Sequence, residues 1–369
     1  MKKLTTLLFV LVFASSMAFA QDNDATVDQT GDDHEANISQ IGQMNESYID
    51  QTDGGGGSTG NADADVDQDG DGNYVNLSQN ALFGQLFGDS QAEITQIGDN
   101  NTVRGQNSGD AFLQSNVGGL VDVYMHGDRN TLYSLRGEAQ KNGNEFLLDV
   151  TGNDNMVGIE QEFAYGDVNI TGDENEVTLS QFAGAGWTTA DYNEANIKQN
   201  GDYNEAHISQ DGLGNKASQA MTAGDDNFVS QEQEGNDNNS RIETWGNDNT
   251  YTNIQDGSSN AFYLNARGTG SGFSSGSGVS DNTVTSIQDG SGHKVGAGID
   301  GQDNTISLIQ FGQDNMITGG TDRWDAEGAR VVGDDNTVSI IQTSNMNNAS
   351  VNVNGSGNTS TITQGLGGS

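Results

Sequence analysis

The sequence predicts an all-β fold, a β-solenoid of stacked 22-residue coils in which each coil is two 11-residue strand–turn units with loop insertions. The first observation is a repeat of the form Asn-x-Ala-x-Ile-x-Gln-x-Gly-x-x, which runs twice in succession over residues 193–215. The second is its spacing, because residues at alternate positions of a strand point to the same side. The third is that the 369 residues include no Pro, which would remove a donor from a central strand.

Stacking explains why polar and apolar residues share the inward side of the unit. A lone strand of one unit cannot bury its apolar side, whereas copies stacked at a fixed period can. Stacking in register places Asn over Asn and Gln over Gln, so that their amides hydrogen-bond along the stack while Ala and Ile fill the interior. The residues predicted to build these ladders and their turns are Asn193, Gln199, Gly201, Asn204, Gln210, Asn304, Gln310, Asn315, Asn336 and Gln342.

The N-terminus has the pattern of a secretory signal peptide over residues 1–20. Lys2 and Lys3 precede an apolar run over residues 4–17, and Ala18-Phe19-Ala20 is a cleavage site that leaves Gln21 first. Removal of two lysines changes the formal charge from -40 to -40 - 2 = -42. This charge argues against nucleic acid and anionic membranes as partners. We therefore expect a secreted, acidic chain that, with no Cys, depends on repetition rather than disulfides for stability.

The mature chain divides into three segments by the quality of the repeat. Residues 21–104 carry clear units, interrupted by a Gly-rich insertion at 54–60 and an apolar insertion at 81–89. Residues 105–192 carry a degenerate repeat, for which we expect further coils with a more apolar core. Regular units return over 193–369. There a Gly/Ser-rich stretch at 268–280 is expected to stand in for one unit, because Asn260 and Asn282 are separated by two lengths of the repeat.

Catalysis has little support in the sequence. The four His are scattered, and His34 and His293 fall on the Asn position of the repeat, which predicts that they substitute for Asn in the ladders. There is no Cys nucleophile, and no Gly-x-Ser-x-Gly motif or Gly-rich phosphate loop is followed by a helical pattern. We therefore expect neither an enzyme nor a cofactor.

Calcium is the one metal that the sequence suggests. A run of alternating aspartates resembles the start of an EF-hand loop, although the twelfth position is Asn76 rather than Glu. The intervening Ala64, Val66 and Gln68 fit the strand pattern, which predicts that the aspartates are outward and turn residues. Weak calcium binding remains an alternative for Asp65, Asp67, Asp69 and Asp71.

Threonines recur on the outward side of the strands in the C-terminal half. They are favoured on solvated strands for their β-propensity, and a flat array of them is also typical of an ice-binding face. The equivalent N-terminal positions are acidic and interrupt such a face. The threonines are Thr250, Thr252, Thr283, Thr285, Thr305, Thr337, Thr359 and Thr361, and the acidic positions are Asp24, Glu35, Glu46 and Asp63.

The spacing of the repeat resembles that of the curli subunits, Ser-x5-Gln-x-Gly-x2-Asn-x-Ala-x3-Gln. Asn193 replaces the Ser, and Gln199, Gly201, Asn204, Ala206 and Gln210 match the other positions. A second copy keeps the Ser but has Val for Ala, and a third has His for Asn. These copies comprise Ser90, Gln96, Gly98, Asn101 and Val103, and Asn23, Gln29, Gly31, His34, Ala36 and Gln40.

The resemblance implies a secreted structural subunit of an extracellular amyloid fibre that serves cell adhesion and the biofilm matrix. Its implied partners are further copies of itself, other curlin-like subunits, an outer-membrane secretion pore and a nucleator. The alternative function is a monomeric β-solenoid, acting as an adhesin or as an ice-binding rod.

Overall fold

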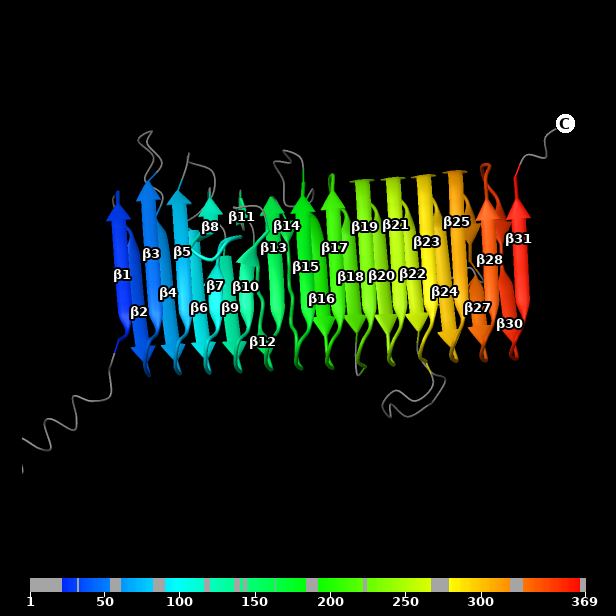
Figure 1. Ribbon diagram of the computed structural model, residues 1–369. Coiled ribbons are helices and arrows are strands. Elements are labelled where there is room, and N and C mark those ends of the chain that lie inside the picture. The colour runs from blue at the N-terminus through cyan, green and yellow to red at the C-terminus, as the bar shows by residue number, and fades with distance from the viewer. Residues whose placement is uncertain are drawn as a thin grey trace, which may run out of the picture. The chain divides into compact units, whose positions relative to one another are not determined.

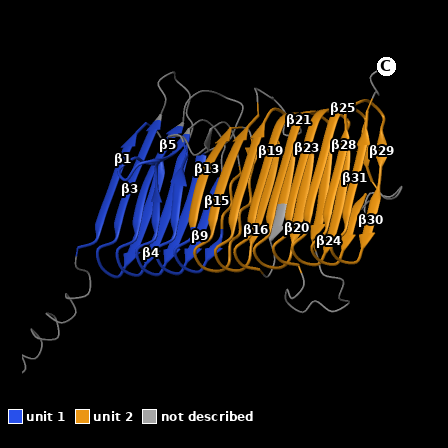
Figure 2. Cartoon of the chain, turned by 45° about the vertical axis from the view of Figure 1, so that its right-hand side comes forward, with its two compact units in different colours: residues 1–143, 149–155 blue, residues 144–148, 156–369 orange. Residues whose placement is uncertain are grey.

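The computed structural model describes most of the chain, which falls into two compact units. Unit 1 comprises residues 1–143 and 149–155, and unit 2 comprises residues 144–148 and 156–369 (Figure 2). The described residues are 22–31, 33–53, 61–81, 90–115, 120–135, 140–141, 145–162, 164–183, 192–221, 224–266, 279–318 and 328–365. The predicted signal peptide at 1–20 and the insertion at 54–60 lie outside these ranges, as do most residues of the insertions at 81–89 and 268–280. No helix that could cross a membrane occurs in the described part of the chain.

Unit 1 consists of two parallel sheets (Figure 1). We call them sheet A and sheet B. Sheet A contains β1 (Asp24–Thr30), β3 (Glu46–Asp53), β5 (Tyr74–Ala81), β7 (Thr102–Arg104), β8 (Phe112–Ser115), β10 (Thr131–Ser134) and β11 (Gln140–Lys141). Sheet B contains β2 (Glu35–Ile41), β4 (Ala62–Asp69), β6 (Ser90–Ile97), β9 (Leu120–His126) and β12 (Val150–Thr151). The chain passes from one sheet to the other after each of these strands except β7 and β10, which are followed in the same sheet by β8 and β11.

Unit 2 has the same two-sheet arrangement. Its sheet A contains β13 (Met156–Glu162), β15 (Glu176–Phe182), β17 (Glu205–Asp211), β19 (Phe228–Asn236), β21 (Thr250–Ser258), β23 (Thr283–Ser291), β25 (Thr305–Gln313), β28 (Thr337–Gln342) and β31 (Thr359–Gln364). Its sheet B contains β14 (Ala164–Tyr165), β16 (Asn193–Gln199), β18 (Lys216–Met221), β20 (Asn239–Thr244), β22 (Ala261–Ala266), β24 (Lys294–Asp300), β26 (Met316–Ile317), β27 (Ala329–Val332), β29 (Asn348–Ala349) and β30 (Val351–Asn354).

The register confirms the predicted solenoid. Asp24 pairs with Glu46, and Glu194 pairs with Lys216, so in each unit a coil without an insertion returns to its sheet after two lengths of the repeat. Parallel strands need a crossover connection, and here the crossover is the strand of the opposite sheet. Each coil is therefore strand, turn, strand and turn, as the two successive repeats in the sequence predict.

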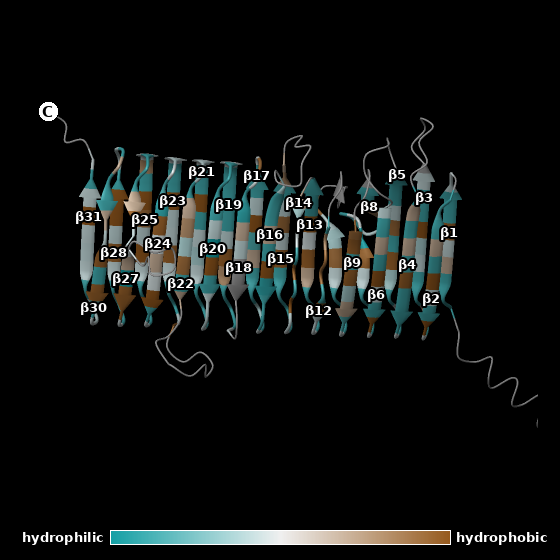
Figure 3. Ribbon diagram, turned by 180° about the vertical axis from the view of Figure 1, so that it is seen from behind, coloured by the Kyte–Doolittle hydropathy of each residue, from teal (hydrophilic) through white to brown (hydrophobic). Residues whose placement is uncertain are grey.

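The core of each unit lies between its two sheets and follows the period of two. On β4 every second residue from Ala62 to Gln68 is buried while the residues between them face outward. The same alternation of hydropathy is visible along the strands in Figure 3. The degenerate segment continues the coils with a largely apolar interior. This interior includes Phe112, Val121, Val123, Met125 and Leu132 in unit 1, and Phe146, Leu148, Val168 and Ile170 in unit 2.

The expectation that the Gly/Ser-rich stretch replaces one unit is wrong. The backbone N–H of Asn282 donates to Oδ1 of Asn249. Asn260 stacks instead with Asn238 and His293 in the opposite ladder. Asn260 and Asn282 are thus consecutive ladder residues along the chain but lie on opposite sides of one coil. The stretch lengthens this coil from two repeat lengths to three and leaves the ladder register unchanged.

Candidate assembly core: amide ladders and turns

An asparagine ladder runs through unit 1 at the start of its sheet A strands. The backbone N–H of Asn73 donates to Oδ1 of Asn45 at 2.9 Å, and Nδ2 of Asn73 donates to the carbonyl oxygen of Gly98 at 2.8 Å. Each ladder residue thereby ties its own turn to the coil before it and the coil after it. A buried amide without such partners would cost about 1–3 kcal/mol. The members are Asn23, Asn45, Asn73, Asn101, Asn130 and Asn155.

Unit 2 holds two asparagine ladders, which contain the Asn residues named from the sequence. Asn204, Asn304 and Asn336 lie in the sheet A ladder, where Oδ1 of Asn304 accepts from the backbone N–H of Asn336 at 3.0 Å. Asn193 and Asn315 lie in the sheet B ladder, where Oδ1 of Asn193 accepts from the backbone N–H of Asn215 at 2.9 Å. All five are buried.

A glutamine ladder follows the far end of sheet A in unit 2. Gln210 accepts from Nε2 of Gln181 at 2.6 Å and donates to Oε1 of Gln233 at 2.7 Å. Gln310 and Gln342 continue the same column, with 2.8 Å between Nε2 of the first and Oε1 of the second. The full column is Gln161, Gln181, Gln210, Gln233, Gln255, Gln288, Gln310, Gln342 and Gln364.

Gln199 departs from the predicted ladder. Its register partner in the next coil of sheet B is Met221, so no glutamine stands there to receive its amide. Its Nε2 donates instead to the carbonyl oxygens of Asn204 at 2.8 Å and Glu176 at 3.3 Å. Its Oε1 is buried and has no hydrogen-bond partner. A glutamine ladder requires Gln at the same position in successive coils. It does not form at Gln199 because the next described strand of sheet B has Met at that position.

Gly201 lies in a turn that only glycine accommodates. Its φ is +117°, and a Cβ there would lie 2.2 Å from the carbonyl oxygen of Gly224 in the neighbouring coil. Its own carbonyl oxygen accepts from Nδ2 of Asn175 at 2.9 Å. The repeat glycine therefore permits both the left-handed turn and the close approach of successive turns.

His34 and His293 occupy Asn positions of the ladders. Nδ1 of His34 accepts from the backbone N–H of Ala62 at 3.1 Å, and Nδ1 of His293 accepts from that of Asn315 at 3.3 Å. In both residues Nδ1 takes the role of asparagine Oδ1. This role requires an unprotonated Nδ1, and burial lowers the pKa of His293 below its ordinary value, consistent with the neutral form.

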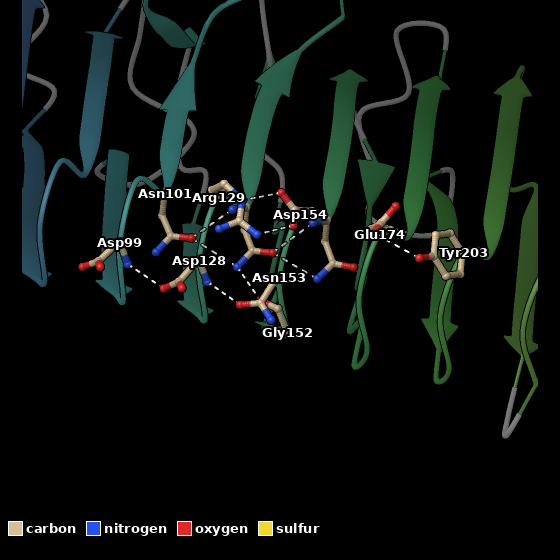
Figure 4. Close-up of polar contacts among 11 residues, drawn as sticks. Asp99, Asn101, Asp128, Arg129, Gly152, Asn153, Asp154, Glu174 and Tyr203 are labelled. Carbon is tan, nitrogen blue, oxygen red and sulfur yellow. Dashed lines mark hydrogen bonds and ion pairs between the residues drawn. The ribbon is translucent and has the colours of Figure 1, made fainter.

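The turns of unit 1 carry a second, outer ladder that the sequence analysis missed. Oδ1 of Asp99 accepts from the backbone N–H of Asp71 at 2.8 Å. Oδ1 of Asp128 accepts from the backbone N–H of Asp99 at 2.9 Å (Figure 4). Asn153 continues the series by accepting from the N–H of Asp128 at 2.9 Å. The available signal was an Asp or Asn directly after the repeat Gly and two positions before the ladder Asn.

An ion pair joins the last two of these turns. The guanidinium of Arg129 contacts both carboxylate oxygens of Asp154 at 2.7 and 2.5 Å (Figure 4). Hydrogen bonding to Arg129 lowers the pKa of Asp154 below its ordinary value. Both residues have positive φ, 59° for Arg129 and 57° for Asp154, so the pair fastens two left-handed turn residues of neighbouring coils.

The four calcium candidates do not converge on one point. Asp65, Asp67 and Asp69 are on the outward side of β4, and Asp71 is in the outer turn ladder, where Oδ1 accepts from the backbone N–H of Gln43. Burial and the carboxylates of Asp67, Asp63 and Glu35 raise the pKa of Asp65. Among the described residues no group of three or more His, Cys, Asp or Glu is placed to hold a metal ion.

The arrangement as a whole is suited to continued stacking. The inward residues of terminal strands β1 and β31 are exposed or half-buried, unlike those of interior strands, and Val27 on β1 is 43% exposed. Oε1 of Gln29 and Nε2 of Gln364 have no ladder partner in a further coil of the described chain. A strand edge of this kind is a template for another chain.

Comparison with known proteins identifies the repeat. The model of the curlin-associated repeat matches residues 20–52, 191–218 and 333–365. No curated protein matches the chain. The matched segments span β1 to all but the last residue of β3, β16 to the start of β18, and β28 to β31. Where the structure describes the coils between them, these have the same strand–turn–strand construction. The chain therefore carries the curlin-associated repeat three times.

Proposed function

We propose that the chain is a curli-type structural subunit of a secreted extracellular amyloid fibre that serves cell adhesion and the biofilm matrix. The observation that carries the proposal is the direction of the ladders. In each unit Nε2 of a ladder Gln donates to Oε1 of the Gln in the following coil. Oδ1 of a ladder Asn accepts from the backbone N–H of the Asn in the following coil. A second copy placed after β31 would bring the Oε1 of its Gln29 to Nε2 of Gln364.

The asparagine ladders support the same assembly. In the last coil the backbone N–H and Nδ2 of Asn358 both bond to Oδ1 of Asn336. By the pattern of the preceding coils, Oδ1 of Asn358 would accept the backbone N–H of Asn23 in the next copy. The partners proposed from the repeat are further copies, other curlin-like subunits, an outer-membrane secretion pore and a nucleator. The proposed role is structural rather than catalytic, and the ladder hydrogen bonds of His34 and His293 support it.

A seeded assembly assay on residues 21–369 tests the proposal. Thioflavin fluorescence and fibre diffraction would be followed at neutral and mildly acidic pH, with and without calcium. We expect fibres with a meridional repeat of about 4.7–4.8 Å. Faster growth in salt or at lower pH would show that screening or protonation relieves the formal charge of these residues, -40 - 2 = -42. A β-rich monomer that never polymerises, even on curlin seeds, would contradict the proposal and favour the monomeric adhesin or ice-binding rod.

A further inference from the structure

The outward side of sheet A in unit 2 contains a region without any charged side chain. It covers five consecutive strands of the sheet, which pair in strict register: β21, β23, β25, β28 and β31. Register-paired residues form columns that run across these strands, and the region contains three of them. We call this region the neutral face. Its columns are Thr250, Thr283, Thr305, Thr337 and Thr359; Thr252, Thr285, Ser307, Ser339 and Thr361; and Ile254, Ile287, Ile309, Ile341 and Thr363.

The neutral face is accessible and laterally regular. The first column is exposed on all five strands, and the isoleucines of the third column are half-buried. Phe311, next outward after Ile309 on β25, is 40% exposed and extends the apolar part of the face. Adjacent strands lie about 4.8 Å apart, so each column repeats one side-chain type, or a close equivalent, at that interval.

The charge of the neighbouring surface sets this region apart. The outward positions of β17 and β19 include Glu205, Asp211, Glu232 and Glu234. The neutral face is bordered by exposed acids at both ends of its strands. Beyond the isoleucine column these are Asp256 and Asp289, and in the turns before the first threonine column they are Asp248, Asp281, Asp303 and Asp335. In a chain with 53 acidic and 13 basic residues, two copies that approach through most surfaces bring carboxylates together. Contact through the neutral face avoids this like-charge juxtaposition.

We propose that the neutral face is a lateral interface, on which the same face of a second copy of this chain packs sheet to sheet. Flat sheets of β-branched residues with little charge and no Pro interdigitate as dry zippers about 10 Å apart. A two-fold arrangement is self-complementary. It would leave Asp256 and Asp289 at one rim and the aspartates of the preceding turns at the other, where they stay hydrated.

The size of the face indicates when this interface forms. Five strands at about 4.8 Å and some six residues at about 3.3 Å give on the order of 450 Å² per copy. The pair would bury about 900 Å², below the roughly 1,200 Å² of a stable complex. A single pair of copies is therefore weak. This inference rests on the proposed function. In a fibre the neutral face recurs in every subunit, so many weak contacts act together and two fibres stay paired.

The test compares two variants that add the same charge to sheet A of unit 2. T252E combined with S307E places two carboxylates on the neutral face, with Thr285 between them in register. The matched control combines T178E with S209E on β15 and β17, outside the face. Fibres of residues 21–369 would be grown in about 0.15 M salt, where screening acts beyond about 8 Å. Electron microscopy would give the fraction of laterally paired fibres, and diffraction the sheet-spacing reflection at about 10 Å.

We expect paired fibres for the wild type and the control, and a several-fold lower paired fraction for the neutral-face variant at unchanged growth rate. Equal pairing of all three, or single wild-type fibres, would overturn the inference while leaving the proposed function intact. Binding of the wild-type chain to ice without any lateral pairing would also overturn it. If no chain forms fibres, the proposed function fails. Sedimentation at the highest soluble concentration then decides: a dimer lost only in T252E/S307E supports the lateral interface, and a monomer throughout contradicts it.

Discussion

Replacing Gln210 by Leu should destabilise the neighbouring coils far more than the same replacement of Gln199 in the same coil. Both side chains are fully buried and both occupy the glutamine position of the repeat. Only Gln210 lies between two other glutamines, with hydrogen bonds of 2.6 and 2.7 Å to Gln181 and Gln233. The pair therefore isolates the contribution of the ladder from that of a buried amide.

The expected magnitude follows from the polar atoms that each change leaves behind. Gln210→Leu leaves Oε1 of Gln233 buried without its donor, although Gln181 Nε2 keeps a bond to the carbonyl oxygen of Tyr165 at 3.2 Å. One orphaned acceptor costs about 1–3 kcal/mol and the lost bonds about 1 kcal/mol more, which gives about 2–4 kcal/mol. The apolar burial gained by Leu is common to both variants and cancels in the comparison.

Gln199→Leu removes an Oε1 that is already buried without a partner. Removal of this unsatisfied oxygen raises the free energy of unfolding, which offsets the loss of the Nε2 bonds to the carbonyl oxygens of Asn204 and Glu176. The carbonyl oxygen of Asn204 also keeps the backbone N–H of Glu176 as a donor, at 2.9 Å. The net change is therefore within about 1 kcal/mol of zero.

Native-state hydrogen exchange measures this difference locally, which suits a solenoid whose coils open in part. Amides of β15, β17 and β19 should exchange at least about fivefold faster in Gln210→Leu than in Gln199→Leu, because the two costs differ by at least about 1 kcal/mol and about 1.4 kcal/mol is tenfold in an equilibrium constant. Amides of β28 provide an internal reference. Equal protection in both variants, or greater loss in Gln199→Leu, would refute the ladder argument.

Three further predictions concern the turns and the ladder histidine. His293→Asn should restore an asparagine to the ladder and reduce the acid sensitivity of its coil. The pKa of His293 is lowered in the folded state. The stability that the neutral ring contributes is therefore present above about pH 6.5 and is lost as the pH falls through the folded-state pKa. Hydrogen exchange at pH 7 and pH 5 checks this, with the outward His207→Asn as the control. Gly98→Ala should lower the free energy of unfolding measured in urea by about 3 kcal/mol, because φ is +111° and the new Cβ would lie 2.2 Å from the carbonyl oxygen of Gly127. The control Gly109→Ala should lower it by less, because no atom lies within 4 Å of the new Cβ. Asp128→Asn should keep the 2.9 Å bond from the N–H of Asp99 and leave the free energy of unfolding unchanged or slightly raised at low salt. Asp128→Ala should lower the free energy of unfolding by about 1 kcal/mol. Equal free energies of unfolding for the two variants would show that the bond contributes nothing.

The sequence predicted the coil because its period is encoded in many residues at once. Ala195 and Ile197 alternate with polar neighbours, so one strand already reveals the inward side, and the return after two repeats sets the register. Whether a ladder is continuous depends instead on single positions in successive coils. Met221 interrupts the column of Gln199, and this becomes visible only when the two strands are aligned.

Insertions and turns were the less predictable parts for different physical reasons. The spacing of Asn260 and Asn282 equals two repeat lengths, and counting alone does not distinguish a full coil from a half-coil with an insertion of one repeat length. The stacking of Asn282 on Asn249 resolves the choice. The outer turn ladder was missed because Asp71, Asp99 and Asp128 lie outside the strand pattern and their hydrogen bonds reach the turn of a neighbouring coil.

The turn ladder bears on why the chain is so acidic. Asn153, Asn247 and Asn345 fill the same position as Asp128 and accept the same backbone N–H, at 2.9 to 3.1 Å. A neutral amide thus satisfies these turns as well as a carboxylate does, so the turn hydrogen bond does not require the charge. Between molecules a charge of this size opposes contact except when salt, acid or a cation screens it. The absence of acids from the neutral face is consistent with this role, because it leaves one side of unit 2 on which copies can meet.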